Sequence, residues 1–201
     1  MSLEKEIYLF DFDGTITNKD SFIHFLTYSK SWFQLFSGFL YIFPFVILMK
    51  LNLYSNEKAK TKLFSFHFKG MDVFQFDRLC LDYSQNELPE IIRASFLDYL
   101  KEVKKENKDL TIVVVSASFK SYLKHWTKFM DFDLVCTELE HKNHVLTGNF
   151  ATKNCYGIEK VNRIREKYSL SEFNKISVFG DSEGDKEMLL LGNKRFYKYF
   201  K

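Results

Sequence analysis

The stretch IYLFDFDGTIT, residues 7–17, joins an apolar run to two carboxylates that stand one residue apart. The apolar run has the length and composition of a buried strand. In a strand with a two-residue repeat, Asp11 and Asp13 point to the same side, so two negative charges meet where the strand ends. This arrangement favours a bound cation, and an oxygen-rich site suits Mg²⁺, which leaves room for a phosphate. For this short string alone, a solvated Asp–Gly turn is the alternative.

The composition is that of a globular protein with an excess of aromatic residues. The 201 residues suffice for one domain, or for one domain with a modest insertion. An aromatic content of 18%, dense in the first half, requires a local explanation. The net charge of +3 is mild and no basic block is present, so nucleic acid is not an expected partner.

The cysteines and the N-terminus indicate a cytoplasmic protein. Cys80, Cys136 and Cys155 are odd in number, widely spaced and free of metal-ligand spacing, so we expect reduced thiols. The charged residues 1–6 do not form a signal peptide. Membrane association stays open because of the segment described next.

An uncharged stretch, residues 31–49, reads SWFQLFSGFLYIFPFVILM and is bounded by Lys30 and Lys50. Its length is at the lower limit for a membrane helix, and its polar residues and Pro44 weaken that assignment. Three structures remain open: a buried hairpin of two helices broken near Pro44, a segment in the membrane interface, and a true span. Peripheral membrane contact through residues 31–49 is therefore one expectation.

Hydrophobic periodicity predicts helices only between residues 17 and 94. The first helix is expected to begin with Ser21 as its N-cap. Beyond residue 94, strands alternate with helices, which predicts an α/β fold whose parallel sheet binds its ligand at the carboxyl ends of the strands. The expected strands are residues 110–115, 134–135, 176–179 and 195–199, the expected helices are 119–129, 154–168 and 186–191, and a polar hairpin covers 137–150.

Polar groups follow three of the predicted strands. The first strand ends at Asp11, the second ends in SAS (116–118), and the fourth ends in GDSEGD (180–185). Side by side, these ends supply a nucleophile, a hydroxyl and two further carboxylates. Lys160 or Lys153 can add a cation.

The order DFDGT, SAS, GIEK and GDSEGD resembles the four motifs of the haloacid dehalogenase superfamily of phosphohydrolases. The resemblance spans the whole chain and is closest to the phosphoserine phosphatase-like branch, subfamily IB. It implies a Rossmann-like core formed by residues 1–16 and 95–201. It also implies a helical cap, residues 17–94, inserted after the first motif.

The resemblance implies a role for each motif residue. Asp11 would attack phosphorus and form an aspartyl phosphate, and Asp13 would serve as acid and base. Thr15 and Ser116 would hold phosphoryl oxygens, while Lys160 would offset negative charge. Lys160 opens a helix in GIEK, which favours it over Lys153.

The resemblance also implies a Mg²⁺ site. Its ligands would be Asp11, the carbonyl of Asp13, and Asp181, with Asp185 in support.

Two substrate classes follow from two resemblances. Asp20 stands where phosphoserine enzymes carry a glutamate at the start of the cap, but those enzymes also use a cap arginine, and this chain has none before Arg78. The apolar stretch 31–49 and Cys155 before GIEK resemble phosphatases related to the enzyme that dephosphorylates phosphatidylglycerophosphate. A small or an amphiphilic phosphomonoester is therefore expected.

Two other functions stay open. One is a catalytically silent binding protein that keeps the fold. The other is phosphotransfer to an alcohol in place of water. The sequence does not predict the oligomeric state.

Overall fold

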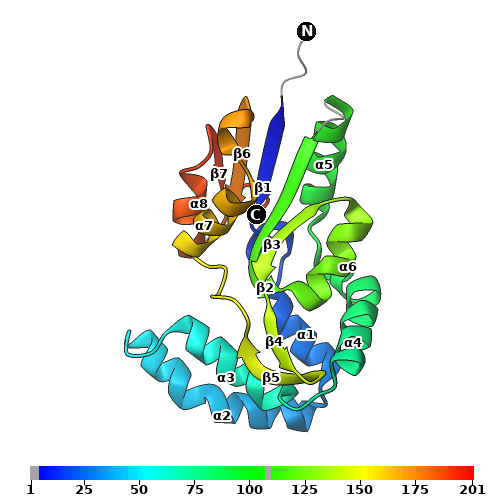
Figure 1. Ribbon diagram of the computed structural model, residues 1–201, viewed down its shortest axis with the longest axis vertical. Helices are drawn as coiled ribbons and strands as arrows, with labels where there is room; N and C mark the ends of the chain where they lie inside the picture. Colours follow the sequence, from blue (N-terminus) through cyan, green and yellow to red (C-terminus); the bar gives the residue numbers. More distant parts are fainter. Residues whose placement is uncertain (1–4, 107–109) are drawn as a thin grey trace.

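A five-stranded parallel sheet in the order β3-β2-β1-β6-β7 forms the centre of the protein (Figure 1). The computed structural model describes residues 5–106 and 110–201. The central strand β1 pairs with β2 on one side and with β6 on the other. The predicted α/β class is confirmed, with strands β1 (Glu6–Phe10), β2 (Leu110–Phe119), β3 (Asp133–Thr137), β6 (Lys175–Gly180) and β7 (Lys194–Tyr197).

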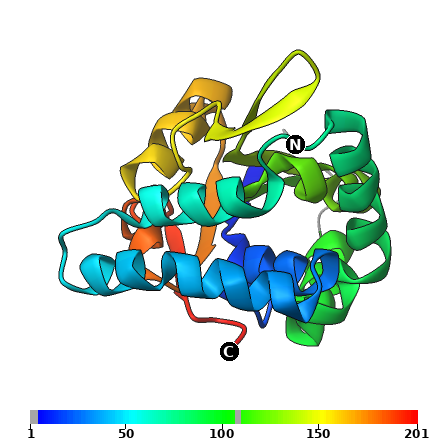
Figure 2. The ribbon, with the colours of Figure 1, turned by 90° about the horizontal axis from the view of Figure 1, so that it is seen from below.

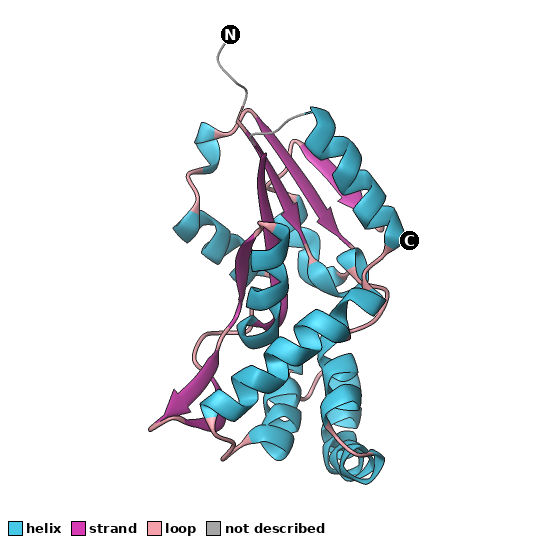
Figure 3. Ribbon diagram, turned by 90° about the vertical axis from the view of Figure 1, so that its right-hand side faces the viewer, coloured by secondary structure: helices cyan, strands magenta, loops and turns pink. Residues whose placement is uncertain are grey.

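Helices cover both faces of the sheet and form a separate layer beyond its carboxyl edge (Figures 1 and 3). Residues 17–94 are helical, as expected, apart from their connecting turns. The helices are α1 (Ser21–Ser29), α2 (Trp32–Lys50), α3 (Asn56–Phe68), α4 (Val73–Asn86), α5 (Ala94–Glu106), α6 (Lys120–Met130), α7 (Ile158–Lys167) and α8 (Lys186–Leu189), with short turns at Phe12–Ile16, Leu88–Ile91, Leu170–Glu172 and Glu183–Asp185.

Alternate residues of β1 point to opposite faces of the sheet. Ile7 and Leu9 belong to the apolar cluster that also contains Ile164 of α7. Tyr8 and Phe10 belong to the larger cluster on the other face, under α5 and α6. This alternation sets the side on which the next residue along the chain emerges.

The first helix begins one residue earlier than predicted. Asp20, not Ser21, is the N-cap of α1, because its Oδ1 accepts the backbone N–H of Ile23 at 2.9 Å. The Ser21 hydroxyl instead bonds to Ser118 Oγ at 3.1 Å. A carboxylate at this position also complements the positive end of the helix dipole.

The apolar stretch forms one helix, so the expected buried hairpin broken at Pro44 is wrong. α2 runs through Pro44 to Lys50, and the chain reverses at Asn52, which has a φ of 59°. Side-chain contacts of α2 with α3 and with the turn between them stabilise the helix. In one of them, Tyr41 stacks on Phe66 of α3 with ring centroids 5.0 Å apart. The reversal therefore lies in the turn after the helix and not at the proline.

A hairpin from the second half of the chain packs on the helical layer (Figure 2). It consists of β4 (Leu139–Lys142) and β5 (Val145–Phe150), in the region where a polar hairpin was predicted. A Cβ on Gly148 would lie 2.5 Å from Ser65 Oγ, so β5 approaches α3 closely. The division into a core and a cap stays a prediction. This hairpin, which belongs to the predicted core, contacts helix α3 of the predicted cap.

The three cysteines are free and buried, as expected for reduced thiols. The prediction that no signal peptide is present concerns residues 1–6, of which 1–4 lie outside the described residues.

His67 occupies the contact between α2 and α3. A Cβ on Gly38 would lie 2.2 Å from His67 Nε2, so the glycine allows the two helices to close on each other. Burial, with a smaller contribution from Lys30, lowers the pKa of His67 to about 4. The contact between these helices therefore favours the neutral imidazole.

We predict that acid weakens the fold through His67. In an unfolded chain histidine titrates near pH 6.5, so between about pH 6.5 and 4 the unfolded chain binds a proton that the folded protein excludes. Stability is therefore lost as the pH falls through this window. Urea unfolding should show a larger loss for the wild type than for His67→Gln, with the exposed His141→Gln as control. Parallel profiles for wild type and His67→Gln would contradict the assignment.

Candidate active site

Asp11 lies at the carboxyl end of the central strand. Its backbone N–H donates to the carbonyl of Phe179 at 2.9 Å, which extends the pairing of β1 with β6 by one residue. Asp11 follows Ile7 and Leu9 in the two-residue alternation, so its side chain emerges on the side of the sheet that α7 covers. The carboxylate is buried there.

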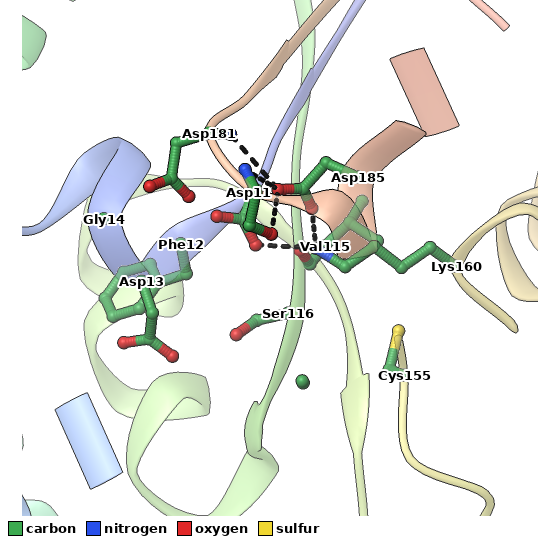
Figure 4. Close-up of polar contacts among 12 residues, drawn as sticks. Asp11, Phe12, Asp13, Gly14, Val115, Ser116, Cys155, Lys160, Asp181 and Asp185 are labelled. Carbon is green, nitrogen blue, oxygen red and sulfur yellow. Dashed lines mark hydrogen bonds and ion pairs between the residues drawn. The ribbon is translucent and has the colours of Figure 1, made fainter. Parts of the chain in front are cut away.

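Lys160 meets Asp11 from the first turn of α7 (Figure 4). Its ammonium donates to Asp11 Oδ1 at 2.6 Å, to Asp185 Oδ1 at 2.6 Å, and to the carbonyl of Val115 at 3.1 Å. Burial alone would lower the pKa of Lys160, but the carboxylates of Asp11 and Asp185 outweigh burial and raise it. The structure places this lysine at the site and leaves Lys153 exposed.

Asp185 organises the loop after β6. Its Oδ2 accepts the backbone N–H groups of Asp181 and Ser182 at 3.1 and 3.0 Å, and the Ser182 hydroxyl at 2.7 Å. Burial raises the pKa of Asp185, but Lys160 and these hydrogen bonds outweigh burial and lower it. Asp185 is therefore ionised and holds Asp181 in place.

Three carboxylates form a candidate cation site. Asp11, Asp181 and Asp185 each offer an oxygen, and these oxygens lie within 4.8 Å of one another. Burial raises the pKa of Asp11 to about 7, and the negative charge of Asp185 adds to this shift while Lys160 opposes it. Asp181 pairs with the partly exposed Lys201 at 2.7 Å. The donor set is all oxygen and has more negative charge than Lys160 neutralises, which fits a hard divalent cation.

Gly14 allows Asp181 to approach the first motif. It adopts a φ of 84°, and a Cβ there would lie 2.5 Å from Asp181 Oδ2. Both the left-handed backbone and the close contact require glycine.

Asp13 belongs to a different hydrogen-bond network. The strand ends at Phe10 and the chain turns at Gly14, so the carboxylate of Asp13 leaves the cluster and accepts the Ser21 N–H at 2.7 Å and the Ser118 hydroxyl. Figure 4 shows it directed away from Asp181. Burial, followed by the charge of Asp20, raises the pKa of Asp13. A raised pKa favours the protonated carboxyl group, which can donate a proton.

The two predicted hydroxyl residues are buried near the strand ends. Thr15 Oγ1 has no hydrogen-bond partner among the described residues. Ser116 Oγ accepts the Ser118 N–H at 2.9 Å and lies between Asp13 and Lys160 in Figure 4. A buried hydroxyl without a partner is costly, so the position of Thr15 fits an additional acceptor such as an anionic oxygen.

A cavity of about 370 Å³ contains both aspartates of the first motif. Its polar end is formed by Asp11, Asp13 and Lys160, and Asp20 lies at its wall. An apolar part of the wall comes largely from the helical layer, with Phe39, Ile42, Val46 and Met49 of α2 and Leu63 of α3. The cavity therefore joins a charged end to an apolar wall.

Lys60 is a site residue that the sequence did not reveal. It comes from α3, lines the same cavity, and donates to the carbonyl of Ala117 at 2.8 Å. Burial lowers the pKa of Lys60, and the charges of Asp13 and Asp20 oppose this shift. In the sequence Lys60 is one of several lysines in this helix, so only the packing of α3 across the strand ends distinguishes it.

The chain is similar to several known proteins. A family model described as haloacid dehalogenase-like hydrolase matches residues 8–190. Protein CicA of Caulobacter vibrioides is 27% identical over 203 residues, which cover all of this chain and 89% of that protein.

Solved structures share the fold at low sequence identity. A protein of unknown function from Bordetella pertussis Tohama I superposes with a TM-score of 0.78 at 13% identity, covering 94% of this chain and 88% of the other. A phospho-aspartyl intermediate analogue of phosphoserine phosphatase superposes with a TM-score of 0.65 at 16% identity, covering 94% and 84%. The Rossmann-like fold of these hydrolases is therefore the fold of this chain.

We predict that removing the Lys160 ammonium destabilises the protein. Lys160→Met would leave two buried carboxylates without their cation, and breaking a buried ion pair in this way costs about 3–5 kcal/mol. The exposed Lys153→Met should change the free energy of unfolding by less than about 0.5 kcal/mol. Urea unfolding in the presence of a chelator measures both. Equal stabilities for the two variants would contradict the structural role of Lys160.

Proposed function

We propose that this chain, which belongs to the haloacid dehalogenase-like hydrolase family, is a phosphatase. It would hydrolyse phosphomonoesters through an aspartyl-phosphate intermediate. One observation carries the proposal: two buried carboxylates of one motif line the same cavity but have different hydrogen-bond donors. Asp11 is paired with the ammonium of Lys160, whereas Asp13 is bonded to neutral donors. The first setting suits a nucleophile and the second suits a proton carrier.

The proposed reaction has two steps. The Asp11 carboxylate forms a bond to phosphorus as the ester oxygen leaves, and Asp13 gives its proton to that oxygen. Asp13 then takes a proton from water, which attacks the aspartyl phosphate and releases inorganic phosphate. Lys160 offsets negative charge on Asp11, while Thr15 and Ser116 would donate to phosphoryl oxygens, as the family resemblance implies.

We infer that the cation is Mg²⁺. Asp11, Asp181 and Asp185 fit it as an all-oxygen set, and Asp13 would add its carbonyl as the family resemblance implies. Bound there, Mg²⁺ would offset negative charge on the phosphoryl group. Lys201 would have to leave Asp181, and its partly exposed position permits this.

The cavity favours an amphiphilic phosphomonoester over phosphoserine. The cations that line it are Lys60 and Lys160, and no arginine guanidinium is among its described lining residues. A substrate carboxylate would therefore lack a bidentate partner. The apolar wall from α2 and α3 instead matches an acyl chain or another apolar group. The three buried, free thiols support a cytoplasmic setting for this activity.

We predict that Asp11→Asn abolishes hydrolysis of p-nitrophenyl phosphate in the presence of Mg²⁺, because the amide is a poor nucleophile. Phosphate release should fall to background, while the exposed Asp98→Asn keeps the wild-type rate. A chelator should remove the wild-type activity, and added Mg²⁺ should restore it.

Three outcomes would contradict this reaction. Turnover by Asp11→Asn would exclude Asp11 as nucleophile. No wild-type turnover on a broad panel of phosphomonoesters would support a catalytically silent binding protein. Transfer of the phosphoryl group to added glycerol would support a phosphotransferase.

We predict that Lys60 contributes to substrate binding. Hydrogen bonds to charged groups contribute about 1.5–3 kcal/mol, so Lys60→Met should lower kcat/KM by about tenfold or more, mainly through KM. Lys62→Met serves as the matched control, because Lys62 lies on the same helix over the ring of Phe45 and does not line the cavity. Steady-state rates with lysophosphatidic acid and phosphoserine measure both variants. Equal effects at the two positions, or a preference for phosphoserine, would contradict the substrate assignment.

A further inference from the structure

The helix α2 exposes a continuous apolar face to solvent. The most exposed side chains include Phe33 at 71%, Leu40 at 65% and Phe43 at 60%. Soluble monomers rarely expose a large contiguous apolar patch unless it is an interaction site. We call this patch the outer face of α2, and it consists of Trp32, Phe33, Phe36, Leu40, Phe43 and Ile47.

The opposite face of α2 packs within the protein. Phe39, Ile42, Val46 and Met49 recur at helical spacing and line the active-site cavity. Gly38 packs against His67 of α3. α2 is long and apolar enough to cross a membrane, with a mean hydropathy of 1.8, and 11% of it is buried. However, a span would separate it from α3 and remove one wall of the cavity.

A helix that is apolar on all sides requires cover on all sides. In Figures 1 and 2, α2 lies at the margin of the molecule beside α3, with no other element of the described residues outside it. The protein therefore covers one side of α2, and another body must cover the outer face.

The charge around α2 indicates which partner covers its outer face. Six lysines less one glutamate give residues 30–69 a formal charge of +5, and because the whole chain carries +3, the remaining residues carry −2. Lys30 and Lys50 flank α2, and Lys58 and Lys62 lie on the adjacent helix α3. A second copy of this chain would bring like charges together, whereas an anionic lipid surface would attract them.

We propose that the outer face of α2 inserts into the interface of an anionic lipid bilayer, with the helix parallel to the membrane plane. The apolar side chains enter the boundary between head groups and acyl chains, and the flanking lysines contact lipid phosphates. Trp32, at the first turn of the helix, suits the interfacial region. The cavity wall formed by the other face of α2 then lies next to the membrane surface.

This binding does not depend on catalysis, so the phosphatase assignment and the membrane assignment fail separately. The inactive Asp11→Asn variant should bind vesicles as the wild type does. Loss of phosphatase activity with retained vesicle binding would leave the membrane proposal intact.

Sedimentation of the full chain with vesicles tests the proposal. The wild type should sediment with phosphatidylcholine vesicles that contain roughly 30% phosphatidylglycerol and much less with phosphatidylcholine alone. Replacing three outer-face residues, Phe36→Gln, Leu40→Gln and Phe43→Gln, should reduce the partition coefficient at least about tenfold.

A matched control replaces three exposed apolar residues elsewhere on the surface, Phe74→Gln, Phe129→Gln and Leu190→Gln. This variant should bind vesicles as the wild type does. Urea unfolding establishes that both triple variants are folded. Equal loss of binding in the two triple variants would overturn the assignment to α2.

Fluorescence of Trp32 reports insertion directly. The chain has two tryptophans, and Trp126 is buried, so Trp126→Phe isolates the signal of Trp32. Anionic vesicles should shift its emission to the blue and reduce its quenching by acrylamide. An unchanged emission with bound vesicles would show that α2 does not insert.

Three further results would overturn the proposal. No sedimentation with anionic vesicles would exclude membrane binding. Self-association that the outer-face variant abolishes would assign the face to a second copy of the chain. Resistance of the membrane-bound protein to an alkaline carbonate wash would indicate a span and not an interfacial helix.

Discussion

The buried ammonium of Lys160 is the contact on which the site depends. It connects Asp11 after β1, the carbonyl of Val115 within β2 and Asp185 after β6, so one cation links three neighbouring strands of the sheet. Two carboxylates can be buried together there only because this charge lies between them. Asp185 in turn accepts hydrogen bonds from the backbone N–H groups of Asp181 and Ser182. Lys160 therefore positions the carboxylate of Asp181 indirectly, through Asp185.

The turn at Gly14 separates the two aspartates of the first motif into different chemical settings. Asp11 stays beside the cation, whereas Asp13 bonds to Ser21 at the start of α1 and to Ser118 at the end of β2. Asp13, the proton carrier of our proposal, is thus held where the helical layer joins the sheet. The N–H of Ser21, at the start of α1, therefore connects Asp13 to the helical layer.

The helical layer resolves the aromatic excess of the first half of the chain. Some of these aromatic residues fill the core that α1, α3 and α4 form over the sheet edge. There the ring of Phe76 contacts those of Phe25 and Phe64. The rest lies on α2, which presents apolar residues both to the cavity and to solvent. Our two proposals connect these faces of α2. The outer face would bind the membrane, and the inner face would line a cavity for the amphiphilic phosphomonoesters that the membrane contains.

Sequence alone determined the α/β alternation, since strand and helix periodicity are local properties of the chain, and the family resemblance of its motifs proposed Asp11, Asp13, Asp181 and Asp185 as site residues. Tertiary structure decided which lysine meets Asp11, because α7 carries Lys160 to the end of β1 while Lys153, before the helix, stays exposed. It also brought Lys60 and the β4–β5 hairpin to the helical layer and left the outer face of α2 uncovered. These features depend on contacts between segments far apart in the chain, which no local pattern records.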